Sequence, residues 1–204
     1  LACLDELGYN TYWQLINAKG CGIPQNRERV IAVSIRKDID RGFTFPEPVF
    51  LKSFMCDFLE ENVEEKYYIS DAYVEEHVGR MSPDDTAVLK CKQIGFLRGG
   101  RWDKMHEQCR RVYSPEYLSP TLTTCMGGNQ EIKILNIDEN KHCSVRKLTP
   151  LEYWRLMGFN DDDFRKAEAV NSNMQLYKQA GNSIVVNVLE GILANLQRQY
   201  IAEH

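Results

Sequence analysis

Three polar side chains at alternate positions, Gln25, Arg27 and Arg29, are the residues of this sequence best suited to hold a ligand. They stand at the mouth of an apolar run that indicates a strand, where alternation places them on one side. Donors would then converge at the edge of a sheet, where α/β enzymes bind ligands. The rigid guanidinium fork matches phosphate oxygens or a pyrimidine carbonyl. The alternative is a solvated strand end whose arginines make salt bridges with Glu28 and its neighbours.

A second group of candidates is a basic run with interleaved glycines and a tryptophan between positions 97 and 111. A polyanion is bound through a local excess of lysine and arginine, even where the formal net charge is -4. Composition alone favours the other interpretation, an ordinary solvated loop. The basic residues are Arg98, Arg101, Lys104, Arg110 and Arg111.

The cysteines are odd in number, widely scattered and without a Cys-x-x-Cys pair. This pattern predicts neither a disulfide framework nor a metal site, so a thiol or metal protein is disfavoured. The seven positions are Cys3, Cys21, Cys56, Cys91, Cys109, Cys125 and Cys143.

The elements that must position these residues fit a chain of 204 residues, which can form one domain or two small ones. Residues 12–16 and 29–35 indicate two strands joined by a Gly/Pro-containing loop. The second is almost continuously apolar, which predicts burial on both faces. Residues 1–8 resemble the end of an amphipathic helix already under way, and the first residue is not Met. We therefore expect a fragment of a longer protein.

After Arg36 the sequence becomes charged and then Pro-punctuated, as is typical of a linker, so we expect a domain boundary there. The middle of the chain gives weaker signals. They predict helices at residues 53–59 and 70–78, and a β-hairpin at residues 121–135 around the pair Gly127 and Gly128.

The last third predicts three helices. Thr149, Pro150 and Glu152 form a capping box with proline at the first helical position, and Gly158 is a C-terminal cap. Ser172 starts a second helix that we expect to end at Gly181. A longer amphipathic helix should then begin near Asn182 or Ser183, with its apolar stripe at Val185, Val188, Leu189, Ile192, Leu193 and Leu196.

The sequence has neither a stretch of about 20 apolar residues nor the pattern of a signal peptide. We therefore expect a cytoplasmic protein with no membrane partner.

Three ordered segments resemble motifs of the DNA cytosine-5 methyltransferases. Residues 17–30, Asn-Ala-Lys-Gly-Cys-Gly-Ile-Pro-Gln-Asn-Arg-Glu-Arg-Val, resemble the family's Gln-x-Arg-x-Arg motif with its lead-in. Residues 146–159 and 175–189 resemble the two motifs that follow it. The family carries a variable target-recognition domain in between, and residues 121–124 with the later glycine pair resemble its end.

The resemblance implies an α/β fold: the C-terminal part of a Rossmann-like S-adenosylmethionine-dependent methyltransferase sheet, with an inserted small mixed α+β target-recognition domain. It divides the chain at residues 1–47, the end of the catalytic domain; 48–148, the recognition domain; and 149–204, helices returning to the catalytic domain. Arg146, Glu152 and Arg155 match a motif that we interpret as structural.

The resemblance also implies an activity. The family flips a cytosine out of duplex DNA, adds a cysteine thiolate to C6 and transfers a methyl group from S-adenosylmethionine to C5, here in a restriction-modification system. Arg29 matches the arginine that holds the flipped base, and Arg27 with Gln25 matches donors to the sugar-phosphate and the closed catalytic loop. Asn182 and Ser183 match the cofactor pocket, although simple helix capping fits them too. The expected DNA contacts are Arg98, Arg101, Lys104, Arg110, Arg111, Thr123, Gly127 and Gly128.

The sequence departs from the family where the nucleophile should be. The family's Pro-Cys dipeptide, its Gly-rich cofactor turn and its Glu-Asn-Val run do not occur, and none of the cysteines follows a proline. We expect the chain to be inactive alone, with double-stranded DNA and a missing N-terminal catalytic half as partners, the latter on the same polypeptide or a separate subunit. The alternative is a stand-alone DNA-binding module derived from such an enzyme.

Overall fold

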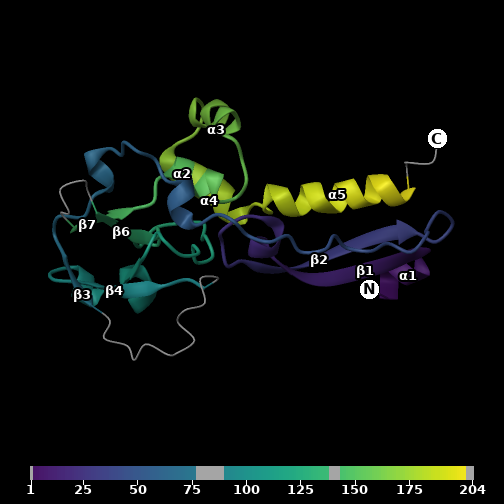
Figure 1. Ribbon diagram of the computed structural model, residues 1–204, viewed down its shortest axis with the longest axis horizontal. Helices are drawn as coiled ribbons and strands as arrows, with labels where there is room; N and C mark the ends of the chain where they lie inside the picture. Colours follow the sequence, from purple (N-terminus) through teal and green to yellow (C-terminus); the bar gives the residue numbers. More distant parts are fainter. Residues whose placement is uncertain (1, 77–89, 138–142, 201–204) are drawn as a thin grey trace.

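The computed structural model describes residues 2–76, 90–137 and 143–200. It is elongated, with a narrow lobe at one end and a broader one at the other, and both ends of the chain lie at the narrow end (Figure 1). One large core cluster joins the lobes, since it includes Ile35, Leu122, Tyr153, Leu176 and Ile192. Within the described residues, no helix has the length and apolar character needed to cross a membrane.

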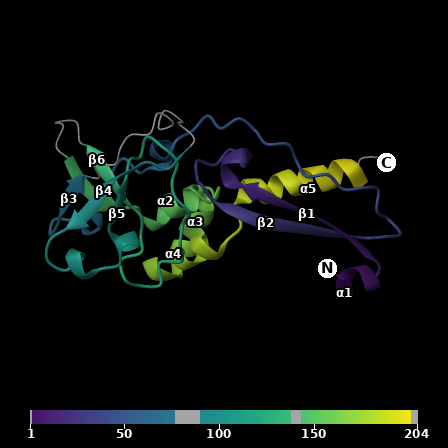
Figure 2. The same ribbon diagram turned by 90° about the horizontal axis from the view of Figure 1, so that it is seen from below.

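The narrow lobe is a hairpin covered by one helix. A short helix α1 (Ala2–Glu6) leads into β1 (Tyr9–Asn17), which pairs antiparallel with β2 (Glu28–Arg36) along its whole length. The connection contains the 3₁₀ turn η1 (Ala18–Cys21), closed by Gly22 with a left-handed φ of 84°. The final helix α5 (Val186–Tyr200) lies along one face of the hairpin in both views (Figures 1 and 2).

The prediction that the second strand is buried on both faces is wrong for this chain. Ile31 and Val33 pack towards the core that includes α5. The opposite face is open, with Trp13 62%, Leu15 55% and Val30 64% exposed. The reason is that this sheet has two strands and a helix on one side only, whereas an apolar run is buried twice only when both faces are covered.

The Pro-punctuated segment after β2 packs against α5. Phe43 is buried, and the Thr44 carbonyl accepts a hydrogen bond from Asn195 Nδ2 at 3.1 Å. Asp40, near the start of this segment, links β1 to α5, because its carboxylate accepts hydrogen bonds from Tyr12 Oη at 2.6 Å and Tyr200 Oη at 2.7 Å. The hydroxyl of Tyr12, aided by further donors, holds the pKa of Asp40 well below its usual range. These bonds fix α5 on the hairpin.

The broad lobe contains a five-stranded sheet in the order β3-β4-β5-β6-β7. All neighbours are antiparallel except β5 and β6, which are parallel. A second, smaller core of Leu97, Trp102, Val112 and Val145 fills this sheet's face. The strands are β3 (Tyr73–Glu76), β4 (Gln93–Arg98), β5 (Arg111–Tyr113), β6 (Lys133–Ile137) and β7 (Cys143–Lys147), and the 3₁₀ turns are η2 (Met55–Phe58), η3 (Glu65–Tyr67), η5 (Trp102–Lys104) and η6 (Glu107–Arg110).

The predictions for the middle of the chain were mostly wrong. Residues 53–59 form only the short turn η2, and residues 73–76 form strand β3 where a helix was predicted; the end of that prediction, at positions 77 and 78, lies outside the described residues. Residues 121–130 form a loop, because β6 pairs with β5 and β7 and not with the segment that precedes it. Val112 pairs with Lys133 and Ile137 pairs with Cys143, and strand alternation alone does not identify such partners.

The structure confirms the predicted starts of two helices in the last third of the chain. Thr149 Oγ1 accepts from the Glu152 amide at 3.2 Å, and the Glu152 carboxylate accepts from the Thr149 amide at 2.8 Å, which confirms the capping box of α2 (Pro150–Arg155). Gly158 follows with φ 85°. Ser172 caps α4 (Asn173–Asn182), which extends one residue beyond the predicted end. The short helix α3 (Asp161–Glu168) was not predicted.

The start of the last helix was placed too early. α5 begins at Val186, whereas Asn182 is the last residue of α4 and Ser183 is its C-cap. The Gly-Asn-Ser sequence is therefore the end of one helix and not the beginning of the next, so its backbone offers carbonyl oxygens more than N–H groups.

A buried ion pair joins three segments of the broad lobe. Arg146 on β7 donates to both carboxylate oxygens of Glu152 on α2, at 2.8 and 2.7 Å, and the two side chains are 2% and 0% exposed. The same carboxylate accepts from the backbone amide of Glu60 at 2.9 Å. The structure thus gives Arg146 and Glu152 the packing role that the sequence indicated.

We expect Glu152→Ala to lower the free energy of unfolding by about 3–5 kcal/mol, because it leaves a buried guanidinium without its partner. Asp162→Ala is the matched control, since it removes an exposed carboxylate that pairs with Arg165 on α3 and should change stability little. Urea denaturation measures both. A loss for Glu152→Ala no larger than that for the control would contradict the assigned role.

Candidate functional site

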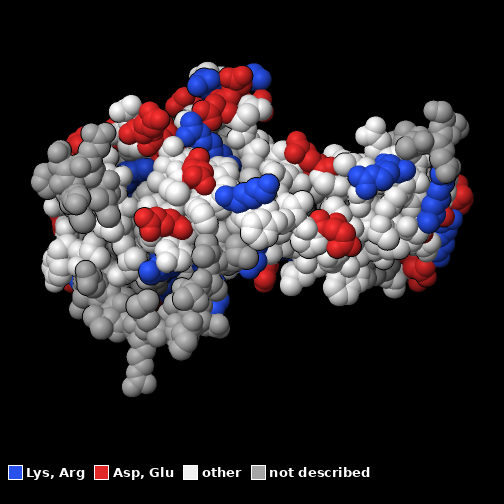
Figure 3. Space-filling view, in the orientation of Figure 1, with Lys and Arg blue, Asp and Glu red and all other residues white. Residues whose placement is uncertain are grey.

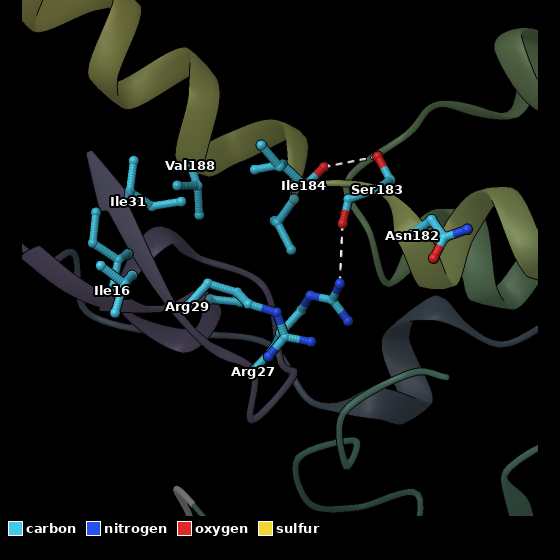
Figure 4. Close-up of a pocket in the computed structure, with 11 residues that line it drawn as sticks. Ile16, Arg27, Arg29, Ile31, Asn182, Ser183, Ile184 and Val188 are labelled. Atoms are coloured by element: carbon cyan, nitrogen blue, oxygen red, sulfur yellow. Dashed lines mark hydrogen bonds between the residues drawn. The ribbon is translucent and has the colours of Figure 1, made fainter. Parts of the chain in front are cut away.

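A cavity of about 270 Å³ lies between the hairpin and the turn that joins α4 to α5. We name it the clamp cavity. Ile31 and Val188 contribute apolar surface on one side, and Arg27, Arg29 and Ser183 contribute polar groups (Figure 4). The lining residues are Ile16, Ala18, Arg27, Arg29, Val30, Ile31, Asn182, Ser183, Ile184, Val185 and Val188.

Arg27 is buried, with 5% of its surface exposed, and its guanidinium is engaged by the protein's own backbone. Nη1 donates to the Leu122 carbonyl at 3.1 Å, and Nη2 donates to the carbonyls of Gly181 at 3.0 Å and Ser183 at 3.1 Å. Burial, and to a smaller extent the neighbouring charge of Arg29, lowers the pKa of Arg27. Arginine nevertheless stays protonated, so a full positive charge sits beside the cavity.

Gln25 does not line the clamp cavity. Its side chain is fully buried, with Nε2 donating to the Leu156 carbonyl at 2.8 Å and Oε1 accepting from the Leu122 amide at 3.3 Å. The predicted alternation fails here because β2 begins only at Glu28, so the backbone before it need not keep the strand period.

Arg29 stands on β2 at the mouth of the cavity and is exposed. Nη1 donates to the Glu28 carbonyl at 2.6 Å, which uses one of the five N–H donors of the guanidinium. Figure 4 shows the side chain directed along the cavity beside Arg27. It is therefore better placed than Arg27 to meet a ligand.

Asn182 and Ser183 both line the cavity, together with Arg27 and Arg29. The Ser183 hydroxyl donates to the Ile184 carbonyl at 3.0 Å, and its own carbonyl accepts from Arg27. The Asn182 side chain is exposed and lies on the far side of Ser183 from Ile31 and Val188 (Figure 4). The two arginines and the Gly-Asn-Ser turn, 152 or more positions apart in sequence, do share one concavity.

A second, larger cavity of about 630 Å³ lies in the broad lobe, and we name it the recognition cavity. It contains two residues predicted to contact DNA, Arg111 and Thr123. Its walls carry hydroxyl, amide, imidazole and carboxylate groups among apolar surface. They are formed by His106, Gln108, Cys109, Arg111, Tyr113, Pro120, Thr121, Thr123, Gln130, Glu131 and Ile132.

The basic run is folded onto turns η5 and η6 and not into a solvated loop. Arg101 pairs with Asp71 at 3.0 Å and lies over the Trp102 ring, and Arg111 pairs with Glu107 at 2.7 Å. Arg98 lies 3.7 Å from Asp103, Arg110 lies over Phe96, and Lys104 is exposed. On the face seen in Figure 3, acidic side chains gather around α3 at the top, away from this run.

Gly127 and Gly128 are exposed, with φ of 116° and 71°. Sequence reasoning missed the side chains that hold this loop. Lys133 is buried and its Nζ donates to the carbonyl of Asn129, a residue with φ 56°. Lys147 Nζ donates to Asn129 Oδ1 at 3.0 Å. No sequence signal marked either lysine, because each follows the alternation of an ordinary strand.

Across the described residues, no three His, Cys, Asp or Glu side chains gather in a way that could hold a metal ion. Burial raises the pKa of the Cys21 and Cys125 thiols, which disfavours the reactive thiolate at both positions.

The fold is that of the Rossmann-like methyltransferases. The chain is similar to Dnmt2 of S. pombe, with a TM-score of 0.63 and 18% identity over 96% of this chain and 57% of that one. It is also similar to the Entamoeba histolytica methyltransferase EhMeth, with a TM-score of 0.61 and 17% identity over 97% of this chain and 56% of that one.

The chain belongs to the C-5 cytosine-specific DNA methylase family, whose model matches residues 1–198. Proteins of this family are S-adenosylmethionine-dependent methyltransferases. Among curated relatives, it is 33% identical to the orphan methyltransferase M.SPBetaI of Bacillus phage SPbeta, over 97% of this chain and 61% of the relative. It is 36% identical to the type II methyltransferase M2.ScrFI of Lactococcus lactis subsp. cremoris, over 96% and 48%. The chain thus spans about half to three-fifths of the relatives it matches.

We expect the stability difference between the wild-type chain and Lys133→Met to depend on pH. Burial lowers the pKa of Lys133 to about 8, against about 10.4 in an unfolded chain. Between these values the unfolded chain binds more protons than the folded one, so the wild-type chain should gain stability relative to the variant as pH rises from about 8 to about 10.4.

Urea denaturation at pH 7 and pH 10 measures this difference. Lys166→Met, on the exposed surface of α3, is the matched control. A Lys133→Met difference that is the same at both pH values would show that the amine titrates normally.

Proposed function

We propose that this chain clamps the base and reads the DNA in a cytosine-5 methyltransferase, which transfers a methyl group from S-adenosylmethionine to C5 of a flipped cytosine in a restriction-modification system. The observation that carries the proposal is the clamp cavity, where Arg29, Arg27 and the Gly-Asn-Ser turn meet. A flipped base needs a pocket with an apolar wall and a few fixed donors, and this cavity offers both.

In this proposal Arg29 donates to the pyrimidine carbonyl of the extruded cytosine and stabilises charge that develops on the ring. Ile31 and Val188 provide apolar surface. Arg27 and Gln25 were expected to hold the sugar-phosphate and the catalytic loop. The Arg27 charge lies close enough to the cavity mouth to attract a phosphate, whereas the buried Gln25 can act only through the backbone that it fixes.

The residues present fit S-adenosylmethionine as far as this chain extends. The exposed Asn182 amide supplies donor and acceptor groups, and Ile184 and Val185 add apolar surface for a nucleoside. Bound there, the cofactor supplies the methyl group. We propose that Asn182 and Ser183 hold it by side-chain and carbonyl groups, since the helix N-terminus first expected at this point lies three residues later.

Double-stranded DNA is the proposed partner of the recognition cavity. Gln108, Gln130 and Thr123 offer hydrogen-bonding groups of the kind that read base edges in the major groove. The basic residues between positions 98 and 111, with Gly127 and Gly128, would approach the phosphates. In this proposal residues 1–47 are the end of the catalytic domain, residues 48–148 are the recognition domain, and residues 149–204 return to the catalytic domain.

The covalent step needs a thiolate that this chain does not offer in the family's sequence context, because none of its cysteines follows a proline. Raised pKa values at Cys21 and Cys125 support the same conclusion. We propose that an N-terminal half provides the nucleophile, on the same polypeptide or as a subunit, and that the chain is inactive without it. A methyl-transfer assay with that half added tests this. DNA binding without any methylation would favour a stand-alone recognition module.

In the completed enzyme, we expect Arg29→Ala to reduce methyl transfer on the order of a hundredfold, because a fixed donor to the reacting base is removed. Overall DNA binding should fall far less, since most of it comes from phosphate contacts. Arg36→Ala, at the opposite end of the same strand and paired with Asp38, is the matched control. Equal methylation rates for Arg29→Ala and wild type would exclude the base-clamp role.

We expect replacement of Arg98, Arg101 and Arg111 by Gln to weaken DNA binding and to flatten its dependence on salt, by up to about 0.9 in slope for each phosphate that the variant no longer neutralises. Gln at Arg165 and Lys166 on α3 is the control, because these cations lie on the acidic surface. Fluorescence anisotropy across a salt series measures the slope. An unchanged slope would place the DNA on another surface.

A further inference from the structure

Two backbone segments from distant parts of the chain touch between residues that line the two cavities. A Cβ atom placed on Gly181 would lie 2.5 Å from Thr123 C and 2.6 Å from Thr124 N, and nearer still to Thr123 O. Ordinary contacts begin at 3.4 Å, so any side chain at position 181 would push the segments apart by roughly 1 Å.

Gly181 is not required by its backbone conformation. It lies inside α4 and has no left-handed φ, and alanine is a better helix former at such a position. Position 181 therefore requires glycine because only a residue without Cβ allows the close approach to the backbone of Thr123 and Thr124.

Side chains from the Gln-x-Arg-x-Arg motif hold these two segments together. Gln25 Oε1 accepts from the amide of Leu122, and Arg27 Nη1 donates to its carbonyl. Arg27 Nη2 reaches across to the carbonyls of Gly181 and Ser183. The backbone N–H and C=O of Leu122 are thus both bonded to buried side chains, those of Gln25 and Arg27. The Arg27 guanidinium also binds the C-terminal end of α4.

The two cavities lie on either side of this junction. Thr121 and Thr123 line the recognition cavity, whereas Arg27 and Ser183 line the clamp cavity. Leu122, buried between the two threonines, faces the core. A shift of the segment that carries the threonines would change the distance between DNA read in one cavity and a base held in the other.

We propose that Gly181, with Arg27 and Gln25, acts as a positioning residue that sets the recognition segment at a fixed distance from the clamp cavity. DNA bound by the recognition segment then presents its cytosine in register with Arg29. This inference rests on the proposed function and deepens it, since it assigns the coupling between reading and base capture to one junction.

The test compares Gly181→Ala with Gly191→Ala in the completed enzyme. Both replace a helical glycine, but a Cβ at position 191 meets only the side chain of Pro46, at 3.3 Å. We expect Gly181→Ala to lower kcat on the cognate site about a hundredfold, and to change kcat far more than its KM for S-adenosylmethionine, because the added Cβ displaces backbone at the junction. Gly191→Ala should keep wild-type kcat. Equal kcat for the two variants would overturn the inference.

Arg27→Lys is the deciding variant if Gly181→Ala fails to fold. Lysine keeps the charge but cannot reach Leu122 and the end of α4 together. A positioning role predicts a fall in kcat with an unchanged salt slope of DNA binding. A wild-type kcat, or a loss confined to DNA affinity and its salt slope, would refute positioning.

The wild-type enzyme distinguishes failure of the junction from failure of the proposed function. If it methylates no cytosine, the proposed function fails. If it is active and Gly181→Ala is equally active, only the junction fails.

Discussion

The guanidinium of Arg27, buried against three backbone carbonyls, is the interaction on which the rest of this structure depends. A buried cation is tolerated only when its N–H groups find acceptors. Two of the acceptors, Gly181 and Ser183, lie at the C-terminal end of α4, where carbonyls lack intrahelical partners and the helix dipole is negative. The guanidinium of Arg27 therefore supplies donors to the unpaired carbonyls at the end of α4, and these carbonyls supply the acceptors that the buried cation needs.

The third acceptor extends this interaction into the broad lobe. Leu122, whose carbonyl is this acceptor, belongs to the loop whose Thr121 and Thr123 line the recognition cavity. The Leu122 amide donates to the Gln25 side chain, which in turn donates to the Leu156 carbonyl after α2. The hairpin, the loop, α2 and α4 are thus connected through two side chains of one short motif. The geometry shows what this motif does in the folded chain: it fixes where four segments meet.

The sequence could predict features whose causes are local or whose motif is long. The capping box at Thr149 and the N-cap at Ser172 depend on residues three positions away, and both are present. Arg27, Arg29, Asn182 and Ser183, which two long motifs indicated as candidates, line one cavity. Gln25 was misplaced because its partners, Leu122 and Leu156, lie 97 and 131 positions away. No periodicity in the sequence reveals such distant partners. Strand alternation also did not identify β5 and β7 as the partners of β6.

The exposed face of the hairpin shows that burial, too, cannot be predicted from a local sequence pattern alone. Trp13, Leu15 and Val30 have the apolar pattern of a covered strand and yet are exposed, because a sequence pattern predicts that a face should be covered and not which segment covers it.

The central claim is that Arg29 and the Gly-Asn-Ser turn face one another across a site that holds an extruded cytosine beside a methyl donor. The most direct measurement is a crystal structure of the completed enzyme with its DNA and S-adenosylhomocysteine. The account predicts the cytosine inside the clamp cavity, with its carbonyl oxygen within hydrogen-bonding distance of the Arg29 guanidinium and the cofactor beside Asn182 and Ser183. A cytosine still stacked in the duplex, or held on another surface while methylation proceeds, would contradict it.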